Sequence, residues 1–198
     1  TLFREFAEKE VKPLAIEVDE TEIFPRETVT KMAKYGFLGI PVAKEYGGQG
    51  ADPLAYVMCV EELSKVCATT GVIVSAHTSL CADPIAMYGT PEQKEKYLVP
   101  LAKGEKLGAF ALTEPNAGTD AQGAVTKAVL DGDEYVLNGS KIFITNGKEA
   151  DIYVVIACTE IKVDAKGRQK KIFSAFIVEK DTPGFGFGTK EKKMGIRG

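Results

Sequence analysis

The first half of the chain carries apolar side chains three or four positions apart, with charged residues between them. Over residues 2–18 this spacing matches one face of an α-helix. Pro13 interrupts that face, and because proline lacks an N–H donor we expect a kink or a junction of two helical pieces there. The same period predicts a second helix over residues 25–36, with Gly36 at its end.

Three more helices are predicted before the pattern changes, over residues 52–67, 69–88 and 90–103. The second of these is apolar on most of its sides, which is typical of a helix buried in a core. Pro100 is expected to bend or end the third. The pattern therefore predicts an all-helical domain over residues 1–106.

The period of the apolar positions falls to about two after residues 104–108, as in β-strands. A hairpin is predicted where residues 125–130 and 135–137 flank the turn sequence Asp-Gly-Asp-Glu. Further strands are expected over 141–145, 152–158 and 172–178, with a polar loop over 162–171. The predicted fold class is therefore α+β, a helical domain over 1–106 followed by an antiparallel β-barrel or sandwich over 107–198.

The composition is that of a globular protein, with 44% apolar and 27% charged residues. A formal net charge of -3 offers no basic field for nucleic acid or an anionic membrane. The longest weakly polar run, residues 66–80, is too short to span a bilayer. No charged-then-apolar segment at the start resembles a signal peptide. We therefore expect neither nucleic acid nor a membrane as a partner.

The cysteines and the single histidine limit the metal and redox chemistry of the chain. Cys59, Cys67, Cys81 and Cys158 form no CxxC pair and lie in apolar contexts. This favours buried free thiols in a reducing cytosol over disulfides or metal ligands. One histidine nearly excludes a His-based zinc site, and for His77 a satisfied core position is favoured over catalysis. The sequence therefore predicts a cytoplasmic protein without a metal site.

The apolar run 107–112 stops abruptly in a polar loop, residues 113–120. Gly118 allows a positive φ, Pro115 restricts its own φ, and the polar side chains of the loop can bond nearby backbone. A strand that ends in such a loop presents N–H groups and hydroxyls, which suit a ligand with many acceptors, such as a flavin ring or a phosphate. Residue types alone favour the alternative, a strand-to-turn junction that binds nothing.

The order of the residues in this loop changes that balance. Ala-Leu-Thr-Glu-Pro-Asn-Ala-Gly-Thr-Asp-Ala-Gln-Gly, residues 111–123, resembles the first signature of the acyl-CoA dehydrogenase family at every fixed position. Residues 141–147 resemble the second flavin-contacting strand of that family, and residues 192–197 resemble the segment that leads into the last part of its middle domain. Residues 77–84 are similar to those of its bacterial short-chain, or butyryl-CoA, members.

The resemblance implies a set of FAD contacts in this chain: Phe110, Ala111, Leu112, Thr113, Gly118, Thr119, Phe143, Ile144 and Thr145. The hydroxyls of Thr113 and Thr145 are implied to hydrogen-bond the flavin ring, because a hydroxyl can donate or accept as the redox state changes. Phe143 would stack on one face of the ring. Gly118 and Thr119 are implied to lie near the flavin pyrophosphate and the pantetheine arm, which makes Thr119 a substrate contact as well. Without the first motif, residues 143–145 would indicate only a buried strand.

The resemblance further implies FAD-dependent α,β-dehydrogenation of a short-chain acyl-CoA, from butyryl-CoA to crotonyl-CoA. That reaction needs a carboxylate that removes the α-proton and an acceptor for the hydride. In the family the base is a glutamate of a C-terminal helical bundle. We expect that bundle to be absent here and hence no catalytic residue in this chain. Glu114, beside Pro115 in a turn, fits a structural role, and residues 72–80 are expected to form a wall for the acyl chain.

Three alternatives remain open from the sequence. The chain could belong to a related flavin oxidase, to a longer-chain acyl-CoA dehydrogenase, or to a non-catalytic fragment that binds flavin or acyl-CoA. The main hypothesis implies an acyl-CoA substrate, an electron-transfer flavoprotein and further copies of the chain as partners, because full-length members of the family form homotetramers. The Gly-rich run 184–188 does not predict a nucleotide loop, since it lacks the strand-turn-helix context.

Overall fold

The N-terminal half is helical in the computed structural model, which describes residues 1–163 and 165–198. α1 (Leu2–Phe6) continues through a π-helical turn to a 3-10 turn, Lys12–Leu14, before α2 (Ala15–Thr21). Pro13 lies in that 3-10 turn, so the predicted junction of two helical pieces is confirmed. Its position fits a turn that does not need the missing N–H group.

The next helices begin and end where their caps allow. α3 (Arg26–Lys34) is followed by Gly36, whose φ of 74° favours glycine and ends the helix. α4 (Pro53–Val66) begins at Asp52, whose carboxylate accepts the Ala55 N–H at 2.8 Å. Such an N-cap satisfies one of the unpaired N–H groups at a helix start.

The central apolar helix is long because three helical pieces run on without a break. α5 (Ala68–Ser75) passes into a π-helical segment, Ala76–Ala82, and then into α6 (Asp83–Tyr88). α7 (Pro91–Gln93) follows, and a π-helical turn then leads into α8 (Val99–Lys103). Pro100 lies in the first turn of α8, so the proline coincides with a change of helix type and the helix continues beyond it.

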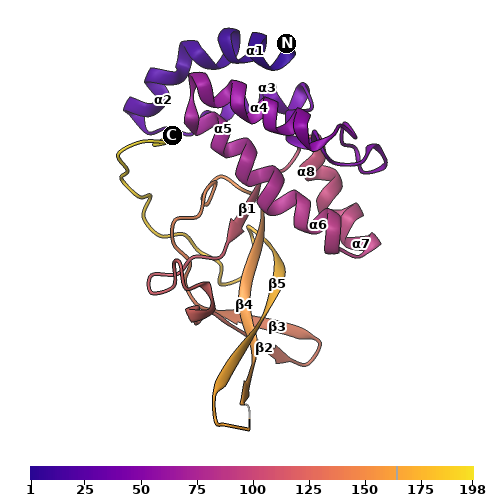
Figure 1. The fold of residues 1–198 in the computed structure, drawn as a ribbon, viewed down its shortest axis with the longest axis vertical. Helices are drawn as coiled ribbons and strands as arrows, with labels where there is room; N and C mark the ends of the chain where they lie inside the picture. Colours follow the sequence, from indigo (N-terminus) through magenta and orange to yellow (C-terminus); the bar gives the residue numbers. More distant parts are fainter. Residues whose placement is uncertain (164) are drawn as a thin grey trace.

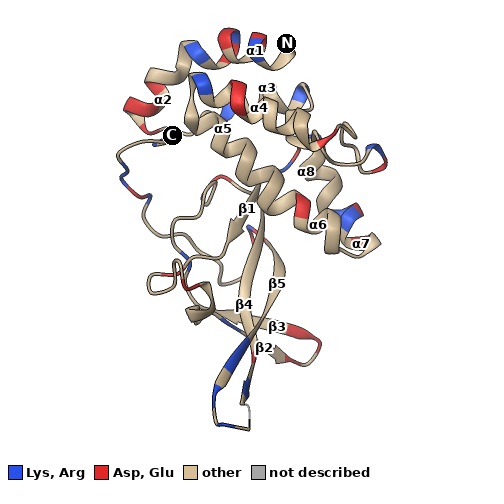
Figure 2. Cartoon of the chain, viewed as in Figure 1, with Lys and Arg blue, Asp and Glu red and all other residues tan. Residues whose placement is uncertain are grey.

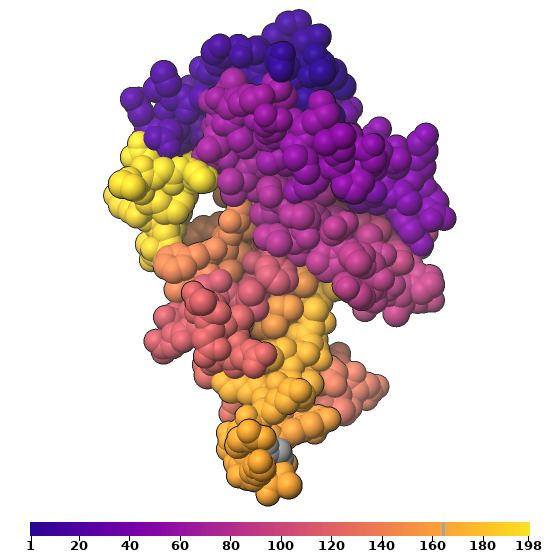
Figure 3. Space-filling view, in the orientation of Figure 1, coloured from indigo at the N-terminus to yellow at the C-terminus, as the bar shows by residue number. Residues whose placement is uncertain are grey.

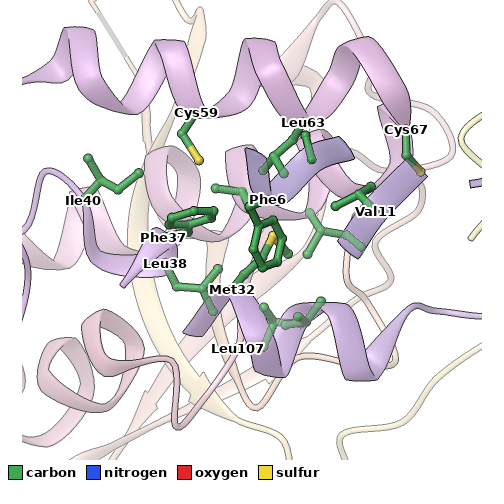
Figure 4. Close-up of a cluster of buried hydrophobic side chains, with 14 residues drawn as sticks. Phe6, Val11, Met32, Phe37, Leu38, Ile40, Cys59, Leu63, Cys67 and Leu107 are labelled. Atoms are coloured by element: carbon green, nitrogen blue, oxygen red, sulfur yellow. The ribbon is translucent and has the colours of Figure 1, made fainter. Parts of the chain in front are cut away.

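A buried apolar cluster holds the helices from α1 to α5 together (Figure 4). Phe6 and Phe37 meet edge to face with ring centroids 5.0 Å apart, and Met32 and Leu63 are fully buried beside them. Burial of each such side chain contributes about 1.5–3 kcal/mol. The predicted burial of the four cysteines is confirmed, and all are free thiols: Cys59, Cys67, Cys81 and Cys158.

The second half of the chain forms one five-stranded sheet, which extends away from the helices (Figure 1). Its strands are β1 (Gly108–Ala111), β2 (Lys127–Asp131), β3 (Glu134–Asn138), β4 (Ile152–Val163) and β5 (Gln169–Glu179). The order is β1-β4-β2-β3, and β5 also pairs with β4. The predicted α+β class is thus confirmed: helices come first and a sheet follows.

The predicted antiparallel barrel or sandwich is wrong, because the sheet is mixed and open within the described residues. β1 runs parallel to β4, with Gly108 opposite Ile152, and β2 meets β4 in parallel at Lys127 and Cys158. Only the β2–β3 and β4–β5 pairs are antiparallel. The long connection from β1 to β4 allows the parallel pairing, which no two-residue turn could make.

Two local predictions also fail, a strand over residues 141–145 and part of a loop over residues 162–171. Residues 141–145 are not a strand: Phe143 has a φ of 57° and Asn146 a φ of 63°, and extended backbone requires negative φ. β4 ends at Val163 and β5 begins at Gln169, so residues 162–163 and 169–171 of the polar loop predicted over 162–171 are strand, whereas residues 165–168 are not. The part of that prediction at residue 164 lies outside the described residues.

The sheet joins the helices through β1, which packs against the π-helical segment Ala76–Ala82. The final residues return to the N-terminal helices, where Arg197 pairs with Asp19 at 2.7 Å (Figure 3). Lys and Arg collect at the far end of the β4–β5 hairpin, whereas both signs of charge mix over the helices (Figure 2). Among the described residues, no helix is both long and apolar enough to cross a bilayer.

Candidate functional site

A cavity of about 190 Å³ lies where β1 ends and the two halves of the chain meet. Three separate segments line it: Ala76 and Leu80 from the central helix, Phe110, Leu112 and Thr113 after β1, and Phe143, Ile144 and Thr145 from the turn before β4. The tertiary structure thus brings together residues from both signature segments and the helical wall. Most of the lining residues are apolar, and the lining also includes two threonines, Thr113 and Thr145.

Phe143 combines an exposed aromatic side chain with a strained backbone conformation. Its side chain is 68% exposed although it is a large aromatic group. Its φ of 57° lies in the left-handed region, which costs a non-glycine residue about 1–2 kcal/mol. Strain and exposure of an aromatic side chain at a cavity indicate a functional position. A flat aromatic ligand with polar edges fits this combination of an exposed aromatic residue, apolar walls and two threonines.

The first lining segment is anchored by a buried ion pair. The Glu114 carboxylate accepts N–H groups from Val125 at 2.7 Å and Thr126 at 3.0 Å, and it accepts the Lys141 ammonium at 2.8 Å. Burial raises the pKa of the Glu114 carboxyl, but the Lys141 ammonium and the bonds from Thr126 and Val125 outweigh that effect and lower this pKa to about 2. A carboxylate so fully bonded has a structural role, as the sequence indicated for Glu114.

The second lining segment is anchored by Asn146, the residue after Thr145. Its side-chain Nδ2 donates to the Ile73 carbonyl at 3.3 Å and to the Gly108 carbonyl at 3.1 Å, so it ties α5 and β1 to the turn. Asn146 is buried and has a left-handed φ, which asparagine tolerates better than most residues. Sequence reasoning missed this role, although an asparagine directly after Thr145 is a signal for such a turn.

The predicted flavin contacts do not all line this cavity. Phe110, Leu112, Thr113, Phe143, Ile144 and Thr145 do. Ala111 instead lies in the separate core formed with Tyr153 on β4. Gly118 and Thr119 are exposed in the loop beyond Glu114 and are not among the lining residues. The flavin and substrate roles of all nine residues remain predictions.

His77 is a buried link between the central helix and β1. Its Nδ1 accepts the Gly108 N–H at 2.9 Å, and its Nε2 lies 3.2 Å from the Leu101 carbonyl. Burial disfavours the imidazolium and lowers the pKa of His77 to about 4, although the Leu101 carbonyl opposes this effect. The histidine therefore stays neutral near pH 7, in the satisfied core position that the sequence favoured.

This histidine should make the chain less stable in mild acid. The unfolded chain takes up a proton near pH 6.5, whereas folded His77 does so only near pH 4, so its contribution is complete above pH 6.5 and is lost as the pH falls. From pH 7 to pH 5 we expect the free energy of unfolding to drop by roughly 2 kcal/mol. Urea unfolding at both values measures this drop. In a His77→Gln variant the drop should disappear, and an equal drop there would refute the assignment.

Two known protein families match the chain over most of its length. The family described as acyl-CoA dehydrogenase, N-terminal domain, matches residues 1–105, and the one described as acyl-CoA dehydrogenase, middle domain, matches residues 109–198. A short-chain specific acyl-CoA dehydrogenase of Clostridium acetobutylicum is 63% identical over 99% of this chain and 50% of that protein.

Solved structures show the same architecture. Butyryl-CoA dehydrogenase from Megasphaera elsdenii has a TM-score of 0.91 and 49% identity over 99% of this chain and 51% of that chain. An acyl-CoA dehydrogenase from Bacillus anthracis complexed with FAD has a TM-score of 0.88 and 40% identity over 99% of this chain and 32% of that chain. The chain belongs to the acyl-CoA dehydrogenase family, and it spans about half the length of the curated relatives it matches.

Proposed function

We propose that this chain is the flavin-binding and acyl-CoA-binding part of an FAD-dependent short-chain acyl-CoA dehydrogenase, which converts butyryl-CoA to crotonyl-CoA. The observation that carries this proposal is the shared cavity: residues of both signature segments and of the helical wall line one space. Relatives named short-chain specific and a related structure complexed with FAD support the choice of substrate class and cofactor.

The residues around the cavity suit that chemistry. Thr113 and Thr145 would bond the polar edge of the flavin, and Phe143 would cover a face of its ring. Leu80 and Ala76 would form the apolar wall beside the acyl chain, which also keeps water from the reacting carbons. Bound FAD would supply the acceptor for the hydride that leaves the β-carbon. None of the residues of this chain is assigned the removal of the α-proton.

The remaining proposals follow from the family resemblance. We propose a domain boundary at residues 106 and 107, a cytoplasmic location, and a homo-oligomer that passes electrons to an electron-transfer flavoprotein. Thr119 and Gly118 would contact the pantetheine arm and the flavin pyrophosphate from the exposed loop. These contacts would form at the solvent edge of the site, outside the cavity itself.

An anaerobic titration tests the proposal directly. The chain is reconstituted with FAD, and its visible absorbance is followed as butyryl-CoA is added. We expect FAD to bind and its absorbance band to shift saturably. A bleached band would show that a residue of this chain removes the α-proton. That result would overturn the proposal that no residue of this chain does so. Failure of FAD to bind would refute the proposed cofactor.

The same assay separates the remaining alternatives. A longer-chain dehydrogenase would bind octanoyl-CoA with higher affinity than butyryl-CoA. An oxidase would return rapidly to the oxidised spectrum when air is admitted after dithionite reduction, whereas a dehydrogenase would return slowly. A non-catalytic flavin module would bind FAD without a spectral response to any acyl-CoA.

Substitution of Thr145 by valine should weaken the flavin complex by about fivefold, the usual effect of one lost hydrogen bond. It should also shift the visible band, because a hydroxyl beside the ring alters its electronics. Thr189→Val is a matched control, since Thr189 is exposed and lies outside the cavity lining. Equal affinities and spectra for Thr145→Val and the unmodified chain would remove Thr145 from the site.

A further inference from the structure

We propose that Lys141 is a positioning residue that holds Thr113 in place at the cavity it shares with Thr145, an inference that rests on the proposed flavin site. Lys141 opens the second signature segment, yet its side chain reaches back to the first one. It does not line the cavity and would not touch the flavin. Its effect on the site would act through the backbone of Thr113.

The Lys141 ammonium is buried and bonds two groups of the first signature segment. Its Nζ donates to the Leu112 carbonyl at 2.9 Å and to the Glu114 carboxylate at 2.8 Å. The side chains of Lys141 and Glu114 are only 9% and 3% exposed. A buried ammonium needs such partners, because an unpaired buried charge is strongly unfavourable.

These contacts fix both peptide groups that flank Thr113. The Leu112 carbonyl belongs to the same planar peptide unit as the Thr113 N–H, so the Lys141 ammonium orients that unit. The Thr113 carbonyl, in the next unit, accepts the Ile142 N–H at 2.9 Å. Two consecutive residues of the second segment thus hold Thr113 from both sides. Because φ and ψ are the only soft backbone dihedrals, these two bonds fix the backbone of Thr113 and hence the point from which its side chain extends.

Stability alone gives little reason for this arrangement. A buried ion pair is often no more stabilising than apolar residues of similar size, and its best-attested use is to specify one geometry. The position it specifies is at the wall that Thr113 shares with Thr145 and Phe143. A ligand with polar edges requires hydrogen-bonding residues at set positions, since a site is most effective when it is preorganised.

A second lysine provides a matched control. Lys171 on β5 donates to the Gly123 carbonyl at 3.0 Å and to the Ala124 carbonyl at 2.8 Å, at the other end of the same loop. It does not line the cavity. Lys171→Met therefore removes an ammonium that binds two carbonyls of this loop, but it leaves the anchors of Thr113 intact.

The test compares FAD affinity, the visible circular dichroism of bound FAD and amide hydrogen exchange in Lys141→Met and Lys171→Met. We expect Lys141→Met to weaken FAD binding by about tenfold, to change the dichroism of the flavin, and to speed exchange of the Ile142 amide. Lys171→Met should change FAD affinity by less than about twofold. Equal changes in both variants, or none in Lys141→Met, would overturn the proposal.

A second variant and a second readout cover the cases in which Lys141→Met does not fold or the chain does not bind FAD. If Lys141→Met does not fold, the double variant Glu114→Gln with Lys141→Met carries the comparison, because it removes both charges and keeps an acceptor for the Val125 and Thr126 N–H groups. If the unmodified chain does not bind FAD, the proposed function fails. Amide exchange at Ile142 would then still decide whether Lys141 holds the Thr113 backbone.

Discussion

Replacing Gly108 by valine is expected to destabilise the chain by roughly 3 kcal/mol, as overpacking of a tight core contact does. A Cβ on Gly108 would lie 2.7 Å from both Cβ and Sγ of Cys81, so β1 and the central helix could not keep their spacing. Both backbone groups of Gly108 are also engaged, the N–H with His77 and the carbonyl with Asn146. Urea unfolding measures the loss.

The same change should damage the candidate site. Phe110 lies two residues farther along β1 and lines the cavity, so a displaced strand moves a wall. Gly188→Val is the control, because nothing lies within 4 Å of a Cβ built at Gly188, and we expect a change below about 0.5 kcal/mol there. Equal stability of the two variants would show that the strand and helix separate more easily than this packing implies.

Removal of the Glu114 carboxylate should have a similar or larger effect. Glu114→Ala leaves the buried Lys141 ammonium without its counter-charge and the Val125 and Thr126 N–H groups without an acceptor. Loss of one partner from a buried ion pair costs about 3–5 kcal/mol. The free energy of unfolding in urea at pH 7 tests this value, since the Glu114 carboxyl, with a pKa of about 2, is ionised there.

A double-mutant cycle separates the ion pair from the rest of the effect. In Glu114→Ala with Lys141→Met, the unpaired charge is gone, so we expect the double variant to lose about 1–3 kcal/mol less than the sum of the single losses. The bonds from Val125 and Thr126 are lost in both backgrounds and cancel in the comparison. Additive losses would mean that Lys141 and Glu114 stabilise the loop independently.

The helical half was largely predictable because its signals are local. Apolar spacing, the proline positions and the glycine after α3 each act within a few residues, and they marked the helices that the structure contains. Strand ends were less predictable because distant side chains decide them. β2 begins at Lys127, later than the apolar pattern suggested, since the Glu114 carboxylate takes the N–H groups of Val125 and Thr126.

The candidate site was likewise predictable from the sequence only in part. The order of residues in the two signature segments was enough to select Thr113, Phe143 and Thr145, which do line one cavity. The apolar run over residues 142–144 wrongly predicted a strand, because Asn146 and the bond from Ile142 to Thr113 hold that segment as a turn. No local pattern could show that Lys141 reaches Glu114, since that contact depends on a fold spanning many residues.

The sequence by itself determined the helical segments, the order of helices before sheet, the family and the identity of most cavity-lining residues. These depend on side-chain periodicity and on residue order, which are properties of the chain before it folds. Only the tertiary structure decided the parallel pairing of β1 with β4, the left-handed turn at Phe143 and the two anchors of Thr113. The pairing and the anchors are contacts between distant segments, and Asn146 holds the turn by bonds to Ile73 and Gly108. The energy of these contacts exists only when the core has brought those segments together.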